Sequence, residues 1–80
     1  MDYEIIVKVI WDCEARVWVA QSDNLSGLIT EADTMEILIE KLKIMIPELL
    51  EVNSIMHHTS EKCIPFHIFG ERLETINMVA

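Results

Sequence analysis

The chain has 80 residues, and its 14 acidic and 6 basic side chains give a formal net charge of −8. This length is enough for one domain, so we expect a single domain over residues 1–80 without a DNA-binding module. Nucleic-acid affinity depends on clustered Lys and Arg side chains, and the basic residues here are scattered among carboxylates, which argues against direct DNA or RNA binding. An acidic surface suits a basic protein partner, although acidity for solubility alone accounts for the charge equally well.

The proportion of hydrophobic residues is high for so short a chain, at 51% with a mean hydropathy of +0.28. A chain of this length buries only about 60–65% of the surface that it exposes when unfolded. Self-association, which buries a second surface, explains the high proportion of hydrophobic residues better than a large core does. We therefore expect a homodimer or a higher oligomer.

The chain shows no sign of export or of membrane insertion. A signal peptide begins with basic residues, whereas this sequence has Asp2 and Glu4 there. A membrane span needs about 18 apolar residues, and every uncharged stretch is much shorter. Cys13 and Cys63 match no zinc or redox spacing. These features predict a cytoplasmic protein with both thiols reduced.

Three short strands are predicted in the first part of the chain. Residues 3–11 and 16–21 alternate with a period of two, and the polar residues 12–15 can turn a hairpin between them. A turn cluster over residues 22–27 precedes a third strand over residues 28–32. Both faces of the first strand are apolar, so alternation alone does not decide which face is buried.

Residues 34–52 have the three-and-four spacing of an amphipathic helix. Asp33 or Thr34 can serve as the N-cap. Pro47 lies inside the pattern and is expected to kink the helix or to end its regular part near Met45. The predicted core stripe consists of Met35, Leu38, Leu42, Met45, Leu49 and Val52, widened by Ile39, Ile46 and Leu50.

The last part of the chain predicts a polar loop over residues 53–63 and a final strand over residues 64–78, with Gly70 as a bulge. A single helix between the third and fourth strands can cover one face of the sheet. The predicted fold class is therefore α+β: a two-layer β-β-β-α-β domain with an antiparallel three-stranded sheet, a fourth strand, and one helix on one face. We expect homodimerisation through apolar sheet surface or through the final edge strand.

Three histidines and one cysteine lie close together in the second half of the chain: His57, His58, Cys63 and His67. Structural zinc sites space their paired ligands by two or more residues, which the adjacent histidines do not match. A solvated histidine pair is the simpler interpretation, so we assign no metal. Whether the His57–His58 loop binds anything stays open.

No catalytic residue is predicted. Cys13 lies between Asp12 and Glu14, whose negative charge disfavours a thiolate nucleophile. Cys63 follows Lys62 but has no orienting third group and no oxyanion-hole signature. The carboxylates match no metal-nuclease motif, and the two glycines are too far apart to form a phosphate-binding loop. We therefore expect neither an enzyme nor a bound cofactor.

The remaining features favour a protein-binding surface. Ile37 and Ile44 are predicted on the helix face opposite the core stripe. Glu48 and Glu51 lie beside them, and apolar residues framed by acids are typical of docking surfaces, although ordinary surface residues look the same. Trp18 is either a core residue or a second contact anchor. The candidate partner-binding residues are Trp18, Ile37, Ile44, Glu48 and Glu51.

Residues 23–36 combine an Asp-x-Leu-x-Gly turn, a short strand and an Asp-Thr pair that opens the helix. The residues in this pattern are Asp23, Leu25, Gly27, Thr30, Asp33, Thr34 and Glu36. The segment resembles the signature of HicB-type antitoxins, with Ser26 in place of the usual proline and Ala32 where glycine is common. The runs that begin at Val7, Arg16 and Met45 are similar to a short bacterial branch of that family, known as a domain of unknown function.

The resemblance covers most of residues 3–52 and implies a partial ribonuclease H-like fold without catalytic carboxylates. It also implies a protein, usually dimeric, that binds and neutralises a small basic HicA-like RNA-cleaving toxin. HicB antitoxins usually carry a C-terminal DNA-binding module that this sequence does not show, so operator binding and autoregulation are not implied. Two alternatives stay open. One is an orphan dimeric interaction module, and the other is a divergent Mg²⁺-dependent ribonuclease that uses Asp12 and Asp33.

Overall fold

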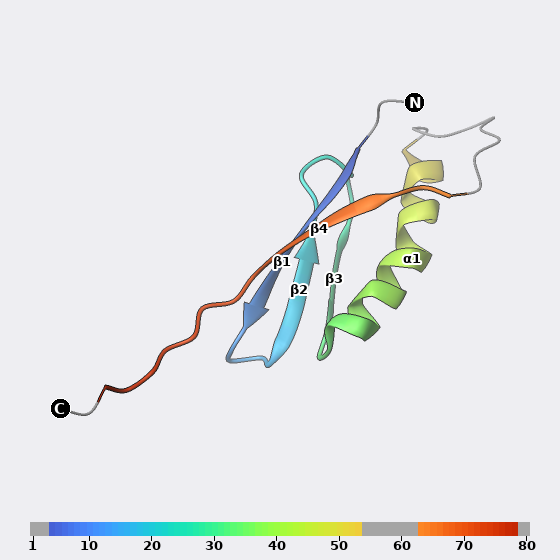
Figure 1. Ribbon diagram of the computed structural model, residues 1–80. Helices are drawn as coiled ribbons and strands as arrows, with labels where there is room; N and C mark the ends of the chain where they lie inside the picture. Colours follow the sequence, from blue (N-terminus) through green and yellow to red (C-terminus); the bar gives the residue numbers. More distant parts are fainter. Residues whose placement is uncertain (1–3, 54–62, 79–80) are drawn as a thin grey trace.

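The computed structural model describes residues 4–53 and 63–78 (Figure 1). In chain order its elements are β1 (Ile5–Asp12), β2 (Val17–Gln21), β3 (Ile29–Ala32), α1 (Met35–Val52) and β4 (Phe66–Glu71). The strands form one four-stranded sheet in the order β3-β2-β1-β4, with α1 packed on one face. The predicted α+β class and the β-β-β-α-β order are confirmed.

The sheet is mixed. β1 pairs antiparallel with β2, and β2 pairs antiparallel with β3, as two short turns allow. β4 instead pairs parallel with β1, because α1 carries the chain from the β3 edge across the sheet to the opposite edge. This crossover makes β3 and β4 the two edge strands.

A four-residue turn joins β1 to β2 and is held by Asp12. Its side-chain Oδ1 accepts hydrogen bonds from the backbone N–H groups of Glu14 and Ala15, at 3.0 and 3.1 Å. Its carbonyl accepts the N–H of Arg16 at 2.7 Å, and Arg16 closes the turn with a positive φ of 59°. Asp12 therefore has a structural role in the hairpin.

The β2–β3 turn is fastened to the start of β1. The Ser22 hydroxyl donates to the carbonyl of Ile6 at 2.6 Å, and the Asn24 side chain accepts the N–H of Ile6 at 3.2 Å and donates to the carbonyl of Glu4. Leu25, inside this turn, is fully buried. The polar cluster predicted as a turn thus also closes one end of the sheet.

The helix begins where the sequence predicts. Thr34 is the N-cap, and its Oγ1 accepts the N–H of Ile37 at 3.1 Å. The buried residues follow at intervals of four and face the sheet: Leu38, Leu42, Ile46 and Leu50. Val52, predicted in the core stripe, is exposed although Leu50 in the same turn is buried, because two residues along a helix are rotated by about 200° relative to each other.

Of the two outcomes expected at Pro47, a kink or an end of the regular helix near Met45, the second is wrong. α1 continues through Pro47 to Val52. The ring occupies an exposed position, so the backbone carbonyl whose helical partner is missing can bond to water. Packing of Ile46 and Leu50 against the sheet, on either side of the proline, holds the last turns in place.

We expect Thr34→Ala to lower the free energy of unfolding by about 1 kcal/mol, because the N–H of Ile37 loses its acceptor. Urea titration followed by circular dichroism would measure this. Asp33→Asn is the matched control at the other candidate cap, and it should change stability by no more than about 0.5 kcal/mol. A larger loss for Asp33→Asn than for Thr34→Ala would contradict this assignment of the cap.

The final strand is shorter than predicted. β4 covers Phe66–Glu71, whereas residues 72–78 are extended but belong to no strand. Within the described residues, the pairing with β1 stops at Ile10 and Glu71, and β1 itself ends at Asp12, so most of residues 72–78 lie beyond the end of their neighbouring strand. Gly70 is not a bulge, since it pairs with Val9 in a register that runs unbroken from Phe66 to Glu71.

Candidate functional site

The two faces of the sheet differ in what covers them. The face that carries Ile5, Val7 and Val9 packs against α1 and forms the core with Leu38 and Leu42. The opposite face has no second layer in the part of the chain that the structure describes (Figure 1). We call it the open face. The strand register assigns to it Ile6, Lys8, Ile10, Asp12, Val17, Val19, Gln21, Ile29, Glu31, His67, Phe69 and Glu71.

Large apolar side chains stand on the open face. Ile10, Ile29 and Phe69 come from three different strands and are 51%, 65% and 60% exposed. Val19 lies beside Ile10, with which it pairs, while Gln21 and Lys8 lie between Ile29 and Phe69 on the two edge strands. Exposed isoleucine and phenylalanine gathered on one surface are costly in water and are typical of interaction sites.

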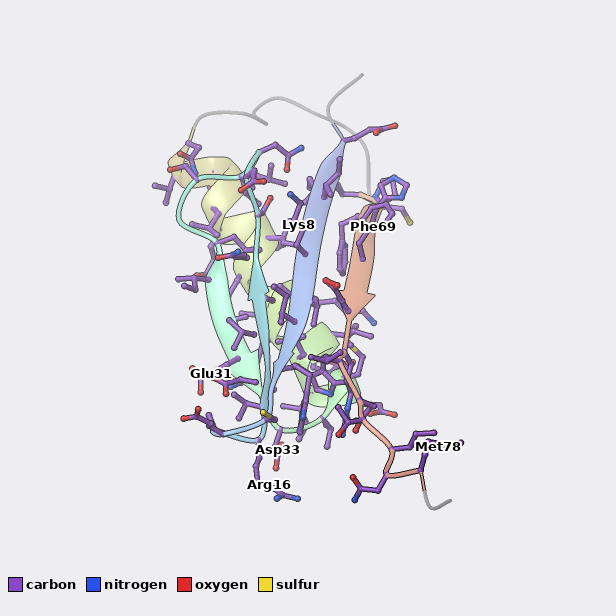
Figure 2. All side chains as sticks on the ribbon, turned by 90° about the vertical axis from the view of Figure 1, so that its left-hand side faces the viewer. Lys8, Arg16, Glu31, Asp33, Phe69 and Met78 are labelled. Carbon is purple, nitrogen blue, oxygen red and sulfur yellow. The ribbon has the colours of Figure 1, made fainter. Side chains whose placement is uncertain are left out.

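The open face also has two shallow depressions. Lys8 lines both of them, and Figure 2 labels Lys8 and Phe69. A shallow depression of about 240 Å³ lies between β1 and β4 and is lined by Ile10 and Phe69. A second depression of about 190 Å³ lies beside Ile6 and Asn24. Both are lined mainly by apolar surface, so each can accept an apolar side chain from a partner.

Charged residues surround this apolar centre. Asp12, Glu31 and Glu71 are exposed at the margins of the open face. Lys8 lies near the centre, but its Nζ is 2.9 Å from Asp23 Oδ2, so its charge is compensated locally. Because both partners of this ion pair are largely exposed, the pair contributes little to stability. The remaining charge of the open face is acidic.

The predicted partner-binding residues do not form one surface. Ile37, Ile44, Glu48 and Glu51 are all exposed on the side of α1 that faces away from the sheet. Trp18 instead lies on the helix-covered face of the sheet, where it is half-buried and packs against the core. Of the two roles that the sequence allows for Trp18, core residue or contact anchor, its position supports the core residue.

Trp18 belongs to an aromatic cluster at the end of the sheet near the β1–β2 turn. Its ring meets Trp11 edge-on, with centroids 5.1 Å apart. The guanidinium of Arg72 lies 4.2 Å from the Trp11 ring centroid and 5.6 Å from that of Trp18. These cation–π contacts fix the chain as it leaves β4.

The residues considered for metal binding or catalysis do not converge. Cys13 and Cys63 are exposed, and the His67 ring stacks on Phe69 with centroids 6.5 Å apart. Within residues 4–53 and 63–78, no three His, Cys, Asp or Glu side chains are placed to share a metal ion. His57 and His58 lie outside the described residues. The same ranges contain no helix with the length and apolar character needed to cross a membrane.

The comparisons with known proteins concern nearly the whole chain. Residues 4–79 match the model of a family described as "Domain of unknown function (DUF1902)". The chain belongs to this family. The DUF1902 domain is also similar to a solved structure, that of hypothetical protein TTHA1013 from the extremely thermophilic bacterium Thermus thermophilus, with 39% identity and a TM-score of 0.67. That similarity covers 95% of this chain and 100% of the other. No curated protein matches the chain significantly.

The segment that carries the HicB resemblance has structural roles in this DUF1902 domain. Leu25 fills the core, Asp23 pairs with Lys8, and Gly27 adopts a φ of +90° that closes the turn. Thr34 caps α1. The pattern therefore sets the β2–β3–α1 geometry, which places α1 on one face of the sheet.

Sequence reasoning predicted contact through an apolar sheet surface but did not identify the residues of the open face. The sequence contains apolar residues on both faces of these strands. Ile6 and Ile10 share the second face of β1, and in β4 the adjacent residues Ile68 and Phe69 point to opposite faces. What was lacking was the knowledge of which face α1 covers, and hence which apolar side chains are left in water.

Proposed function

We propose that this domain is a non-enzymatic, cytoplasmic protein-binding module whose docking surface is the open face of the sheet. The observation that carries the proposal is the exposure of Ile10, Ile29 and Phe69 on a sheet whose other face packs against α1. Burying an apolar side chain of this size contributes about 1.5–3 kcal/mol. Three exposed side chains of this kind on one face of the sheet supply apolar contact area of the kind that stable interfaces have.

The charge of the surface supports a basic partner. Asp12, Glu31 and Glu71 frame the apolar residues, and the chain as a whole has a formal net charge of −8. Complementary charge at the rim of an interface accelerates association and orients the partner, while the apolar centre provides affinity. A phosphate backbone would be repelled by the same carboxylates.

The resemblance to HicB antitoxins suggests the class of partner. A small, basic, HicA-like RNA-cleaving toxin has the positive surface that the acidic rim would attract, and a bound antitoxin would neutralise it by covering its RNA-binding site. We propose this toxin as the partner. The domain would then act by occlusion, with no chemistry of its own.

The test is a binding titration with any small basic HicA-like protein that is found encoded beside this gene. We expect a stable complex, and we expect Ile29→Ala and Phe69→Ala each to weaken it by about 10-fold or more, as removal of an interface anchor does. Raising salt from about 50 to 500 mM should slow association, because it screens the acidic rim. The affinity would be measured by isothermal titration calorimetry.

Ile44→Ala is the matched control, since Ile44 on the outer face of α1 is 65% exposed, as is Ile29 on the open face. It should leave affinity unchanged. If Ile44→Ala weakens the complex and Ile29→Ala does not, the binding surface is the strip of Ile37, Ile44, Glu48 and Glu51. Failure to bind any neighbouring basic toxin would reject the antitoxin role and favour an orphan interaction module.

The ribonuclease alternative has a separate readout. It requires Mg²⁺-dependent RNA cleavage that is lost in Asp12→Asn or Asp33→Asn. Because Asp12 Oδ1 already accepts two backbone N–H groups of the β1–β2 turn, we expect no such activity. Cleavage by the purified chain that disappears in both variants would overturn the non-enzymatic proposal.

A further inference from the structure

β4 has a free edge. It pairs with β1 on one side, and on its other side it pairs with no strand in the described part of the chain. Its unused backbone N–H and C=O groups form a template for another extended segment. A second strand added here would continue the sheet beyond four strands.

The chain itself supplies an extended segment. Residues 72–78, which we call the arm, leave β4 and run past the β1–β2 turn (Figure 1). The arm carries three apolar side chains, Leu73, Ile76 and Met78, which are 86%, 82% and 85% exposed. The contact of Arg72 with the Trp11 and Trp18 rings fixes the direction of the arm.

The arm dominates the shape of the molecule. The longest principal extent is 62 Å, against 22 and 19 Å for the others, and the radius of gyration is 15.5 Å. A compact chain of this length has a radius of gyration of about 12 Å. If the arm stays in solvent, its three apolar side chains remain exposed to water, which is unfavourable.

An apolar groove lies beside the free edge of β4. It has a volume of about 160 Å³ and runs between the second half of α1 and the start of β4. Its walls are Ile46 and Pro47 from the helix and Ile64 and Phe66 from the strand side, with Lys43 at one end. A chain that pairs with β4 would direct alternate side chains over this groove.

We propose that two copies of this chain dimerise by exchanging their arms, so that the arm of each copy pairs antiparallel with β4 of the other. The contact is isologous and closes on itself, since each copy donates one arm and accepts one. It satisfies the free backbone groups of β4 and removes the arm's apolar side chains from water in one step.

Symmetry restricts the register of this pairing. A two-fold axis perpendicular to the sheet keeps each face on its own side, so a residue can lie opposite only a residue that faces the same way. In β4, Phe66 and Ile68 face the helix-covered side, because they pair with Ile5 and Val7. Even-numbered arm residues must therefore lie on the helix-covered side of the second copy, and odd-numbered ones on its open face.

One register matches every apolar residue of the arm. With Leu73 opposite Phe69 of the second copy, Ile76 lies opposite Phe66, and Met78 lies opposite Ile64. Phe66 and Ile64 are the strand-side walls of the groove, so Ile76 and Met78 cover it. In this register the two Glu71 side chains face each other at the axis, where like charges oppose association.

The first test measures the mass of the full chain by sedimentation equilibrium or light scattering. We expect twice the chain mass of 9.3 kDa at micromolar concentration. Ile76→Asp combined with Met78→Asp should weaken dimerisation by at least about 10-fold. Thr75→Asp combined with Asn77→Asp adds the same charge to the same arm on its other side, and should weaken dimerisation much less. A monomer at all concentrations would overturn the proposal, and so would equal effects of the two double variants.

The second test fixes the register by disulfide cross-linking between two differently tagged chains. Residues directly opposite in an antiparallel pair have Cα atoms about 4.5–5.5 Å apart, which suits a disulfide. With Cys13 and Cys63 replaced by serine, a chain with Leu73→Cys should oxidise rapidly to a chain with Phe69→Cys. It should react slowly with a chain that carries His67→Cys. Absence of a Leu73–Phe69 link in a dimeric sample would overturn the arm exchange. In the same register Glu71→Gln removes the like charges at the axis, so it should lower the dissociation constant of the dimer.

Discussion

Leu38→Ala is expected to lower the free energy of unfolding by about 2–5 kcal/mol. Leu38 is fully buried at the centre of the contact between α1 and the sheet, where the truncated side chain leaves a cavity that its neighbours cannot fill completely. The total stability of a domain of 80 residues is about 4–12 kcal/mol, so this single change removes a large part of it. Urea unfolding at a fixed protein concentration would measure the loss, because a dimer unfolds in a concentration-dependent way.

Ile37→Ala provides the control for this prediction. Ile37 precedes Leu38 in α1 but points away from the sheet and is exposed. Its truncation should change stability by about 0.5 kcal/mol or less. Equal losses for the two variants would mean that α1 does not pack on the sheet through the stripe of Leu38, Leu42, Ile46 and Leu50.

Gly27→Ala is expected to destabilise the domain by about 1–3 kcal/mol, because two costs act at one position. The backbone of Gly27 has a φ of +90°, which a residue with a Cβ adopts only under strain. A Cβ added there would also lie 3.1 Å from Cδ2 of Leu49, closer than ordinary van der Waals contact. The turn would therefore shift away from α1, and thermal unfolding should show a lower midpoint.

The second glycine is the matched control. Gly70 lies in β4 without a positive φ, and a Cβ added there would meet its nearest atoms, Cε of Met35 and the carbonyl oxygen of Val9, at 4.0 Å. Gly70→Ala should be neutral or should stabilise the domain by up to about 0.5 kcal/mol, because alanine loses less backbone entropy on folding. A loss at Gly70 as large as at Gly27 would contradict the view that conformation sets the requirement for glycine.

Much of the local structure could be predicted from the sequence because it depends on neighbouring residues. The period of two over residues 5–12 and 17–21 produced strands, and the position of Thr34 before an amphipathic pattern produced a capped helix. These signals depend on backbone geometry and short-range hydrogen bonds. Pro47 misled the prediction for the same reason, since the local penalty is real but packing on both sides of the proline outweighs it.

The candidate site could be predicted only in part. The exposed helix residues Ile37 and Ile44 were placed correctly from their spacing, but the spacing could not compare them with the open face. Trp18 was assigned two possible roles because alternation gives the face of a strand and not what covers that face. The side chains of Ile10, Ile29 and Phe69 come to share one face only through pairing between strands that are distant in sequence.

By itself the sequence determined the number and type of the elements, the turn that closes at Gly27, and a charge that disfavours nucleic acid. Only the tertiary structure decided that β4 lies parallel to β1 at the edge of the sheet, that α1 covers one face, and that the arm pairs with no strand within residues 4–53 and 63–78. The physical reason is that periodicity and capping are local, whereas burial is decided by contacts between residues far apart in the chain. An apolar side chain becomes a binding surface when those contacts leave it in water.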